Sequence, residues 1–154
     1  MNINACTLQM LSSNPFIDSS DKMLSVMPIF HGNGLVIGVH TMFKVGATCV
    51  LIPRFTPKTY VHDLLKHKCN YMSGVPALFE KMIQEPEIQK ADLSFMKGVF
   101  SGADSLSVEL ERKIDKFLEE HNDFTLVKED QIMPFGETDT TMYYAIMQKE
   151  IIDD

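Results

Sequence analysis

Four short stretches of the chain combine glycine or proline with polar side chains directly after an apolar run. They are residues 28–34, 74–76, 101–104 and 135–140. Glycine lets a ligand approach backbone N–H groups closely, and in open parallel sheets ligands bind beyond the carboxyl ends of the strands. Each stretch taken singly also fits an ordinary turn between a strand and a helix. Together the four stretches predict one binding crevice.

Two of these stretches carry side chains with specific chemistry. His31 follows a buried strand and lies between Phe30 and Gly32, although a histidine with a purely structural role fits the same pattern. In residues 136–139 a threonine stands between two carboxylates. Such a group suits a contact with phosphate and Mg²⁺, because Mg²⁺ is commonly held by one or two carboxylates plus ligand phosphates. A capping threonine or aspartate in a solvated loop looks the same.

Several common motifs are absent from the sequence. Neither G-x-G-x-x-G nor G-x-x-x-x-G-K-[ST] occurs, which argues against a dinucleotide fingerprint or a P-loop within these residues. Ser101 has Val99 and Ala103 two positions away, so it does not form the G-x-S-x-G elbow of an esterase. His62 and His67 are separated by about 140° on a helix and do not share a metal ion.

Strand-length apolar runs alternate with helical patterns along the chain. The predicted strands are residues 23–27, 48–52, 70–73 and 96–100. Thr56 before Pro57, Pro76, and Ser107 each mark the start of a predicted helix. This alternation implies right-handed crossovers and predicts an α/β fold, a doubly wound and mostly parallel sheet with flanking helices.

The pattern becomes less regular near residue 122. Residues 1–122 are predicted to form the α/β segment, and residues 123–154 a divergent acidic tail. Within this tail, residues 123–128 are a predicted strand, and residues 140–152 are either a helix or a frayed end.

The composition of the 154 residues is that of a soluble globular domain, with 45% hydrophobic and 23% charged residues. The net charge of −7 disfavours binding to nucleic acid or to anionic lipid. Three separated cysteines without a CxxC pair fit a reduced, cytoplasmic setting. No signal peptide is expected, and no transmembrane segment, since the longest apolar stretch contains His40, Lys44 and Gly46.

Five motifs in the chain occur together, in order, in a known family. They are LSVMPIFHGNGL (residues 24–35), GA (46–47), PRF (53–55), GVPAL (74–78) and FSGA (100–103). From about Asn4 to His121 the chain closely resembles the middle of adenylate-forming enzymes, especially fatty-acyl-CoA synthetases. Members of that family join a carboxylic acid to AMP, release pyrophosphate, and pass the acyl group to a thiol such as coenzyme A.

On the acyl side, the resemblance implies that His31 lies near the substrate carboxylate at the mouth of an acyl tunnel. The residues that it implies for the substrate-binding wall are Gly32, Gly34, Gly74, Val75 and Pro76.

On the nucleotide side, the resemblance implies that Ser101, Gly102 and Ala103 form the loop against which adenine packs. The family's next motif is an aromatic residue, Gly, any residue, Thr and Glu, and residues 135–139 resemble it. Phe135 and Gly136 then meet the adenine, Thr138 bonds a phosphate, and Asp139 meets Mg²⁺. Phe135 lacks a phenol hydroxyl, Asp139 is one methylene shorter than Glu, and the motif arrives a few residues late.

The sequence therefore leads to a first hypothesis, in which the chain is an internal fragment of an ATP-dependent acyl-CoA synthetase, with little or no ligase activity by itself. ATP, Mg²⁺ and coenzyme A are the expected cofactors and acceptor of the complete enzyme. A second hypothesis is a stand-alone flavodoxin-like module that binds a nucleotide or an acyl chain without turnover, and a third is a truncated product. Uncovered apolar faces also predict self-association.

Overall fold

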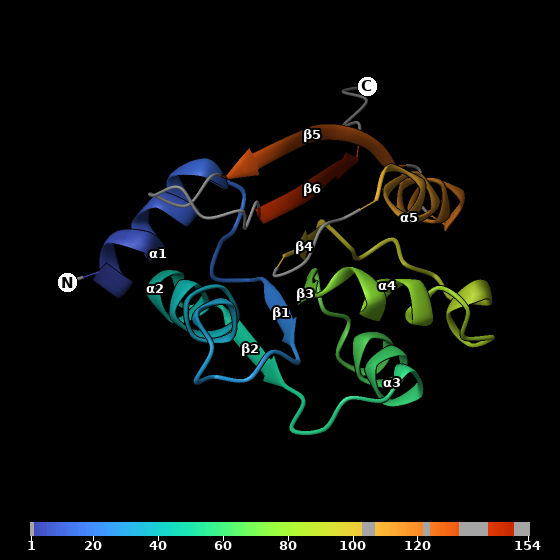
Figure 1. Cartoon of the computed structure of the whole chain (residues 1–154), viewed down its shortest axis with the longest axis horizontal. Coiled ribbons are helices and arrows are strands. Elements are labelled where there is room, and N and C mark those ends of the chain that lie inside the picture. Colours follow the sequence, from blue (N-terminus) through green and yellow to red (C-terminus); the bar gives the residue numbers. More distant parts are fainter. Residues whose placement is uncertain (1, 103–106, 122–123, 133–141, 150–154) are drawn as a thin grey trace.

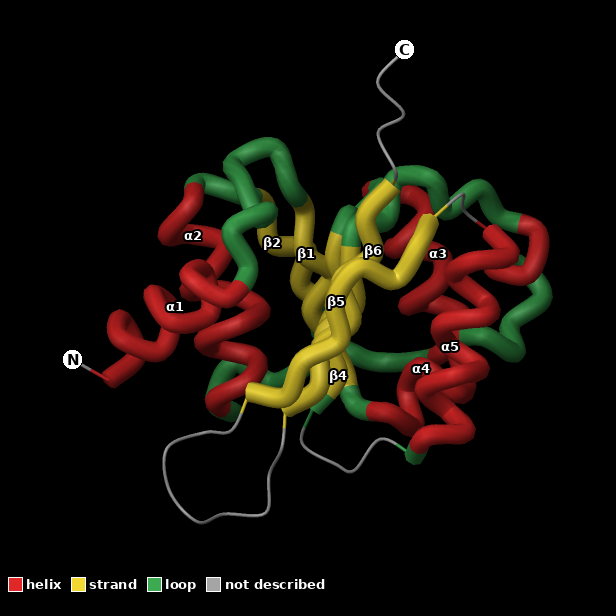
Figure 2. Tube along the Cα trace, turned by 90° about the horizontal axis from the view of Figure 1, so that it is seen from above, coloured by secondary structure: helices red, strands yellow, loops and turns green. Residues whose placement is uncertain are grey.

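A sheet of six strands forms the centre of the structure, with helices on both of its faces (Figures 1 and 2). The structure is a computed structural model that describes residues 2–102, 107–121, 124–132 and 142–149, the last two ranges by their backbone. The strands are β1 (Lys22–Ser25), β2 (Thr48–Leu51), β3 (Tyr71–Gly74), β4 (Gly98–Ser101), β5 (Phe124–Ile132) and β6 (Met142–Lys149). The helices are α1 (Asn2–Ser13), η1 (Gly34–His40), α2 (Thr41–Val45), α3 (Pro57–His67), α4 (Pro76–Met82), η2 (Ile88–Lys90) and α5 (Val108–His121).

The strand order is β2-β1-β3-β4-β6-β5. Strands β1 to β4 pair in parallel, whereas β6 is antiparallel to both β4 and β5. The predicted doubly wound, mostly parallel α/β fold is therefore confirmed. Each parallel strand is within three residues of its predicted bounds.

Each buried strand faces two helical layers, because successive side chains point to opposite faces of a sheet. Met23, Tyr71 and Phe100 belong to a core shared with Met10 of α1 and Ile37 of η1. Leu24, Met72 and Val99 belong to the core beneath the other layer. Figure 2 shows these two layers edge-on, with α1 and α2 on one side and α3, α4 and α5 on the other.

The helix starts follow the local signals of the sequence. Thr56 and Thr59 form a capping box, in which each side chain bonds the other residue's backbone N–H at 3.1 Å, and Pro57 is the first residue of α3. Pro76 begins α4 in the same way. At α5, Ser107 Oγ accepts a hydrogen bond of 3.2 Å from the Leu110 N–H. These three predicted starts are confirmed.

The segment after β1 departs from a regular α-helix. Residues 34–40 of η1 form a π-helix, and Thr41 Oγ1 donates to the Val36 carbonyl, five residues back, at 2.8 Å. Gly38 lies directly against the Ser25 side chain, where a β-carbon would collide with Ser25 Oγ. This close approach to β1 is a tertiary constraint that helical periodicity does not encode.

The tail also differs from its helical prediction. A helix over residues 140–152 is wrong for the part that is described, because residues 142–149 form β6. That segment contains two tyrosines and an isoleucine, residue types that favour strands, and its backbone pairs with β4, which otherwise has a free edge. The predicted strand at 123–128 corresponds to β5, which continues to Ile132. No described helix is long and apolar enough to cross a membrane.

Candidate functional site

The strand order creates a switch point between β1 and β3. The chain moves from β1 to β2 on one side and returns to β3 on the other side of β1, with Ser25 in register with Ser73. The helical connections after these two strands therefore leave on opposite faces of the sheet, and in open α/β sheets ligands bind beyond the carboxyl ends of the strands at such a point. The loops that follow β1, β3 and β4 are the candidate site.

His31 lies in the loop after β1 with its side chain exposed. Its backbone N–H donates to the Pro28 carbonyl at 2.9 Å, and its Nδ1 accepts from the Asn33 N–H at 3.2 Å. With Nδ1 acting as the acceptor, a neutral imidazole carries its proton on Nε2. The loop therefore fixes the ring and leaves an Nε2–H donor for a ligand oxygen.

The two glycines beside His31 have different steric surroundings. A β-carbon on Gly34 would collide with the carbonyl oxygens of Met27 and Pro28, so glycine at this position lets η1 begin against the preceding loop. Among the described atoms, nothing lies within 4 Å of a β-carbon built on Gly32. Gly34 therefore has a packing role, and Gly32 is open to a neighbour.

The ends of β3 and β4 form the second wall of the candidate site. The Gly102 N–H donates to the Gly74 carbonyl at 3.2 Å, which joins the two loops directly. Val75 caps α4, with its carbonyl 2.9 Å from the Leu78 nitrogen, and Pro76 is buried as the first helical residue. The structure therefore brings residues 74–76 and 101–102 together, as the crevice interpretation expects.

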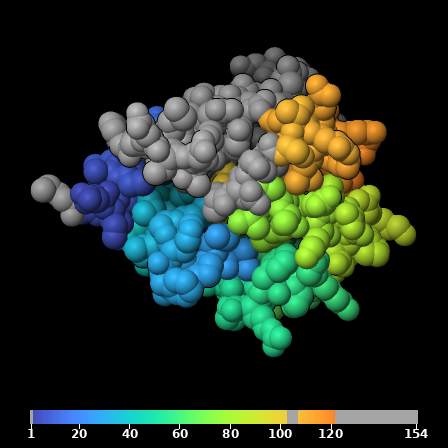
Figure 3. All heavy atoms as spheres, viewed as in Figure 1, coloured from blue at the N-terminus to red at the C-terminus, as the bar shows by residue number. Residues whose placement is uncertain are grey.

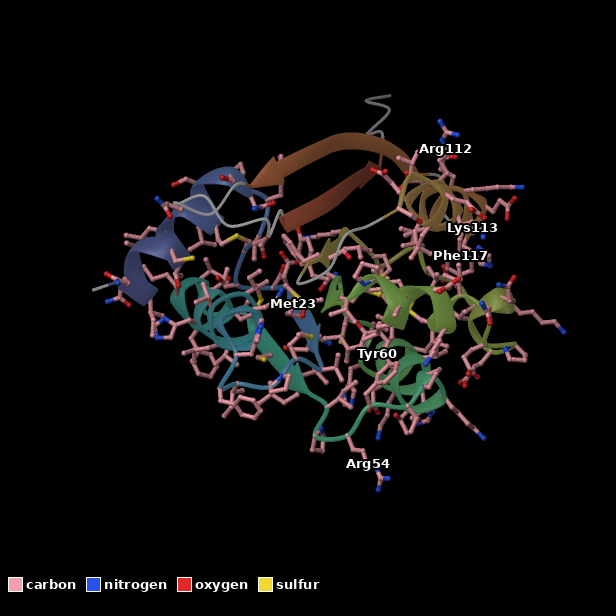
Figure 4. The ribbon with its side chains drawn as sticks, in the orientation of Figure 1. Met23, Arg54, Tyr60, Arg112, Lys113 and Phe117 are labelled. Carbon is pink, nitrogen blue, oxygen red and sulfur yellow. The ribbon has the colours of Figure 1, made fainter. Side chains whose placement is uncertain are left out.

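Helix α3 contacts the carboxyl end of β3 on the face of the sheet that it shares with α4 and α5. Tyr60 is fully buried between α3 and the sheet (Figure 4), and its hydroxyl donates to the Ser73 carbonyl at 3.2 Å. Burial raises the pKa of Tyr60 well above its ordinary value, so the phenol keeps its proton and remains a donor.

Several buried polar atoms near this edge have no partner among the described residues. They are the hydroxyls of Ser25, Ser73 and Ser101 and the Oδ1 of Asn33. A buried polar group without a hydrogen bond costs about 1–3 kcal/mol, unless a ligand or water completes it. Ser101 is among the site residues predicted from the sequence, whereas Ser25, Ser73 and Asn33 are not. A serine within a buried apolar run is the sequence signal that could have identified Ser25 and Ser73.

Two cysteines near the sheet are not candidate nucleophiles. Burial raises the pKa of Cys49 to about 11 and that of Cys69 to about 12. Both thiols therefore remain protonated at neutral pH. Within the described part of the chain, no group of three or more His, Cys, Asp or Glu side chains could hold a metal ion.

Five site residues predicted from the sequence lie outside the described residues: Ala103, Phe135, Gly136, Thr138 and Asp139. Their assignments to adenine, phosphate and Mg²⁺ stay predictions.

Comparisons with known proteins give a consistent result. The family model described as "AMP-binding enzyme" matches residues 1–150. A long-chain-fatty-acid–CoA ligase of Bacillus subtilis is 32% identical over 99 residues, which cover 64% of this chain and 18% of that protein. A 4-coumarate–CoA ligase of Solanum tuberosum is 29% identical over 100 residues, covering 65% of this chain and 18% of the relative.

Solved structures share the fold. ATP-bound MatB from Rhodopseudomonas palustris superposes with a TM-score of 0.67 at 22% identity, covering 75% of this chain and 22% of that one. A long-chain-fatty-acid-CoA ligase from Archaeoglobus fulgidus superposes with a TM-score of 0.63 at 22% identity, covering 79% and 24%. The chain spans about a fifth of the length of these proteins.

Proposed function

Because the chain belongs to the family of AMP-binding enzymes, we propose that it supplies the acyl- and adenine-binding wall of an ATP-dependent acyl-CoA synthetase. In that reaction a carboxylate attacks the α-phosphorus of ATP, pyrophosphate leaves, and a thiol then displaces AMP from the acyl adenylate. The observation that carries the proposal is the common edge at which the His31 loop, residues 74–76 and residues 101–102 follow adjacent parallel strands.

His31 is the residue proposed to act on the acyl group. Its Nδ1 accepts from the Asn33 N–H, and its Nε2 bonds no group among the described residues. A donor held in place by its own loop needs little rearrangement to meet a carboxylate oxygen, and fixed donors stabilise charge that develops in a transition state. Gly32 and Gly34, on the same loop, would border the acyl chain.

The walls of the proposed crevice differ in chemistry. Val75 and Pro76 form a stiff apolar corner at the start of α4, suited to an acyl chain. Ser101 and Gly102 offer a compact backbone and a buried hydroxyl that has no partner among the described residues, suited to the edge and face of adenine. The acyl chain and the nucleotide would thus meet between β3 and β4.

ATP, Mg²⁺ and coenzyme A belong to this proposal as the family's substrates and cofactor. Phe135, Gly136 and Thr138 would hold the nucleotide, and Asp139 would supply one carboxylate to Mg²⁺ beside the ATP phosphates. When bound, Mg²⁺ would neutralise phosphate charge during displacement.

Placement of the phosphates requires positioned groups around the whole reaction centre, and these 154 residues span about a fifth of the length of the relatives. We therefore expect little or no ligase activity from the chain by itself.

Exposed apolar side chains support the proposal that other parts of a larger enzyme cover this segment. Phe30 is 92% exposed and Ile29 57%, both in the loop after β1, and Leu51 at the end of β2 is 52% exposed. Alone in solution, such side chains favour self-association. Sedimentation of the chain over a range of concentrations tests this expectation, and a strictly monomeric chain would contradict it.

The decisive test uses a chimera in which residues 4–121 replace the matching segment of the B. subtilis ligase. We expect fatty-acid-dependent exchange of pyrophosphate into ATP, and a decrease of about 100-fold for His31→Ala, the loss typical of one donor to developing charge. His62→Ala, an exposed histidine on α3, is the matched control and should leave exchange unchanged. Exchange that does not depend on the fatty acid would overturn the substrate class.

One observation favours the second hypothesis, a binding module. The order β2-β1-β3-β4 is the one found in flavodoxin-like sheets, which bind nucleotides at the same switch point. Calorimetric titration of the 154-residue chain with ATP and with an acyl adenylate distinguishes the two hypotheses. Saturable binding by the chain alone would support the module, and no binding would support the segment.

A further inference from the structure

A second hollow lies away from the candidate site, between α1 and α2. It has a volume of about 440 Å³, and the residues that line it are Asn4, Thr7, Leu8, His40, Phe43 and Lys44. Figure 3 shows α1 in dark blue beside the blue-green surface of η1 and α2. This volume is within the usual range of small-molecule sites, about 300–1,000 Å³.

The position of the hollow separates it from the His31 loop. Helix η1 starts next to that loop and runs back along the sheet, and α2 then ends at the Gly46 turn. Two residues later Thr48 begins β2, in register with Lys22 at the amino end of β1. The hollow therefore lies toward the amino ends of the strands, whereas the proposed acyl site lies at their carboxyl ends.

The charged side chain that lines the hollow, that of Lys44, is positive. Lys44 is exposed and His40 half-buried, and no carboxylate is among the described residues that line it. Within the part of the chain that is described, Lys44 forms no ion pair. The first turn of α1 also has no acidic residue to balance the positive end of its helix dipole. An anionic group is the complement of this lining.

Thr7 adds an unused hydrogen-bonding group to the wall. Its side chain is 2% exposed, and its Oγ1 has no partner among the described residues. A buried threonine in a helix commonly donates to a carbonyl one turn back, as Thr41 does to Val36 at 2.8 Å in the neighbouring helix. Thr7 lines the hollow without such a bond, so its hydroxyl is available to an oxygen bound there.

Two large apolar side chains complete the lining. Leu8 is 52% exposed and Phe43 68% exposed, one from each helix. A ligand that covered them would gain about 25 cal/mol for each Å² of apolar surface removed from water. The lining therefore combines a cationic, hydrogen-bonding part with an apolar part.

We propose that this hollow binds a small amphipathic anion, a carboxylate or phosphate head group on an apolar body. The head group is held by Lys44, His40 and the Thr7 hydroxyl, and the body lies between Leu8 and Phe43. The site is distinct from the acyl-binding crevice and does not depend on adenylation chemistry.

The test is a titration of the 154-residue chain with octanoate, octyl phosphate and octanol, followed by calorimetry and by amide NMR shifts. We expect one saturable site for at least one of the two anions, with shifts in α1 and α2, and at least tenfold weaker binding of octanol. The stronger of the two anions identifies the head group. Lys44→Glu should weaken binding at least tenfold, and Thr7→Val about threefold.

Two further variants make the outcome specific. Lys66→Glu makes the same change of charge at an exposed position of α3 and should leave the affinity unchanged. His31→Ala should also leave the affinity unchanged. Equal binding of octanol, or an equal loss in Lys66→Glu, would overturn the proposed site. Shifts confined to the His31 loop, with loss in His31→Ala, would assign the anion to the acyl crevice and leave the proposed function standing.

Discussion

The polar side chains at the two ends of the parallel strands differ in their hydrogen bonding. At the amino ends, the side chains of Asn70 and Asp21 have bonding partners. The Asn70 side chain accepts from the Lys22 N–H and donates to the Phe95 carbonyl, each at 3.0 Å. Asp21, which is 1% exposed, lies 2.7 Å from Lys97 Nζ. These contacts join the starts of β1, β3 and β4.

At the carboxyl ends of the same strands the buried hydroxyls of Ser25, Ser73 and Ser101 have no partner among the described residues. The backbone there is bonded, as between Gly102 and Gly74 and between the Ser73 carbonyl and the Tyr60 hydroxyl. The amino edge therefore holds the sheet together, and the carboxyl edge keeps donors and acceptors that contribute little to stability. This division is what an open α/β sheet needs when ligands bind at one edge.

The largest expected effect comes from breaking the amino edge. Asn70→Ala removes both side-chain bonds and leaves the half-buried Lys22 N–H and Phe95 carbonyl unpaired, at about 1–3 kcal/mol for each group. We expect the free energy of unfolding in urea to fall by about 3 kcal/mol. Gln84→Ala, at an exposed position, is the control and should change it by less than about 0.5 kcal/mol. A loss in Asn70→Ala no larger than in the control would remove the distinction between the edges.

The next effect contrasts two glycines at the carboxyl edge. Gly34→Ala forces a β-carbon against backbone oxygens that cannot move aside, and overpacking of this kind costs about 1–3 kcal/mol. Gly32→Ala meets no described atom within 4 Å, and neither glycine has a positive φ. It should leave stability unchanged or raise it by up to about 1 kcal/mol. In the chimera, a weaker acyl affinity for Gly32→Ala with unchanged stability would show that Gly32 borders the substrate.

A smaller effect separates an unpaired hydroxyl from a paired one. Ser73 and Thr41 are both 0% exposed, but only Thr41 has a bonded hydroxyl. Thr41→Val should lower the free energy of unfolding by about 1 kcal/mol, because it removes a hydrogen bond and leaves the Val36 carbonyl without that donor. Ser73→Ala should leave stability unchanged or slightly raised. Equal losses in the two variants, measured by urea unfolding, would mean that Ser73 is satisfied by bound water.

Local signals were sufficient to predict part of this molecule. Thr56 with Pro57 predicts the start of α3 because a cap and a first-turn proline act within four residues. The order of apolar runs and helices predicts the parallel sheet, and with it the shared edge of the candidate loops. The position of His31 after a buried strand follows from the same pattern.

Features that depend on contacts between distant residues could not be predicted in this way. β6 forms by pairing with β4 more than forty residues earlier in the chain. The bridge made by Asn70 joins Lys22 and Phe95, and Gly38 of the π-helix η1 lies directly against Ser25 of β1. Periodicity within a window of residues carries no information on these partners.

The last expected effect is small and depends on pH. The Asp18 carboxylate accepts from the Ser20 hydroxyl and the Ser20 N–H, and Lys97 lies nearby, so the pKa of Asp18 is lowered from its ordinary 3.8. A carboxyl with a lowered pKa in the folded state stabilises the fold above its ordinary pKa, and this contribution is lost as the pH falls through the folded-state value.

The pKa shift of Asp115 is opposite in direction to that of Asp18. Partial burial on α5, followed by the nearby Glu119, raises the pKa of its carboxyl, so the folded state retains this proton more strongly than the unfolded chain. The Asp115 carboxyl therefore lowers the stability of the fold near neutral pH, and this loss disappears as the pH falls. Asp18→Asn should destabilise the chain most near neutral pH, with the difference from wild type shrinking below about pH 4, whereas Asp115→Asn should be stabilising near neutral pH and lose that advantage in acid. Urea unfolding at a series of pH values measures both. Parallel pH profiles for the two variants would show that the hydrogen bonds of Asp18 do not contribute to the stability of the amino edge.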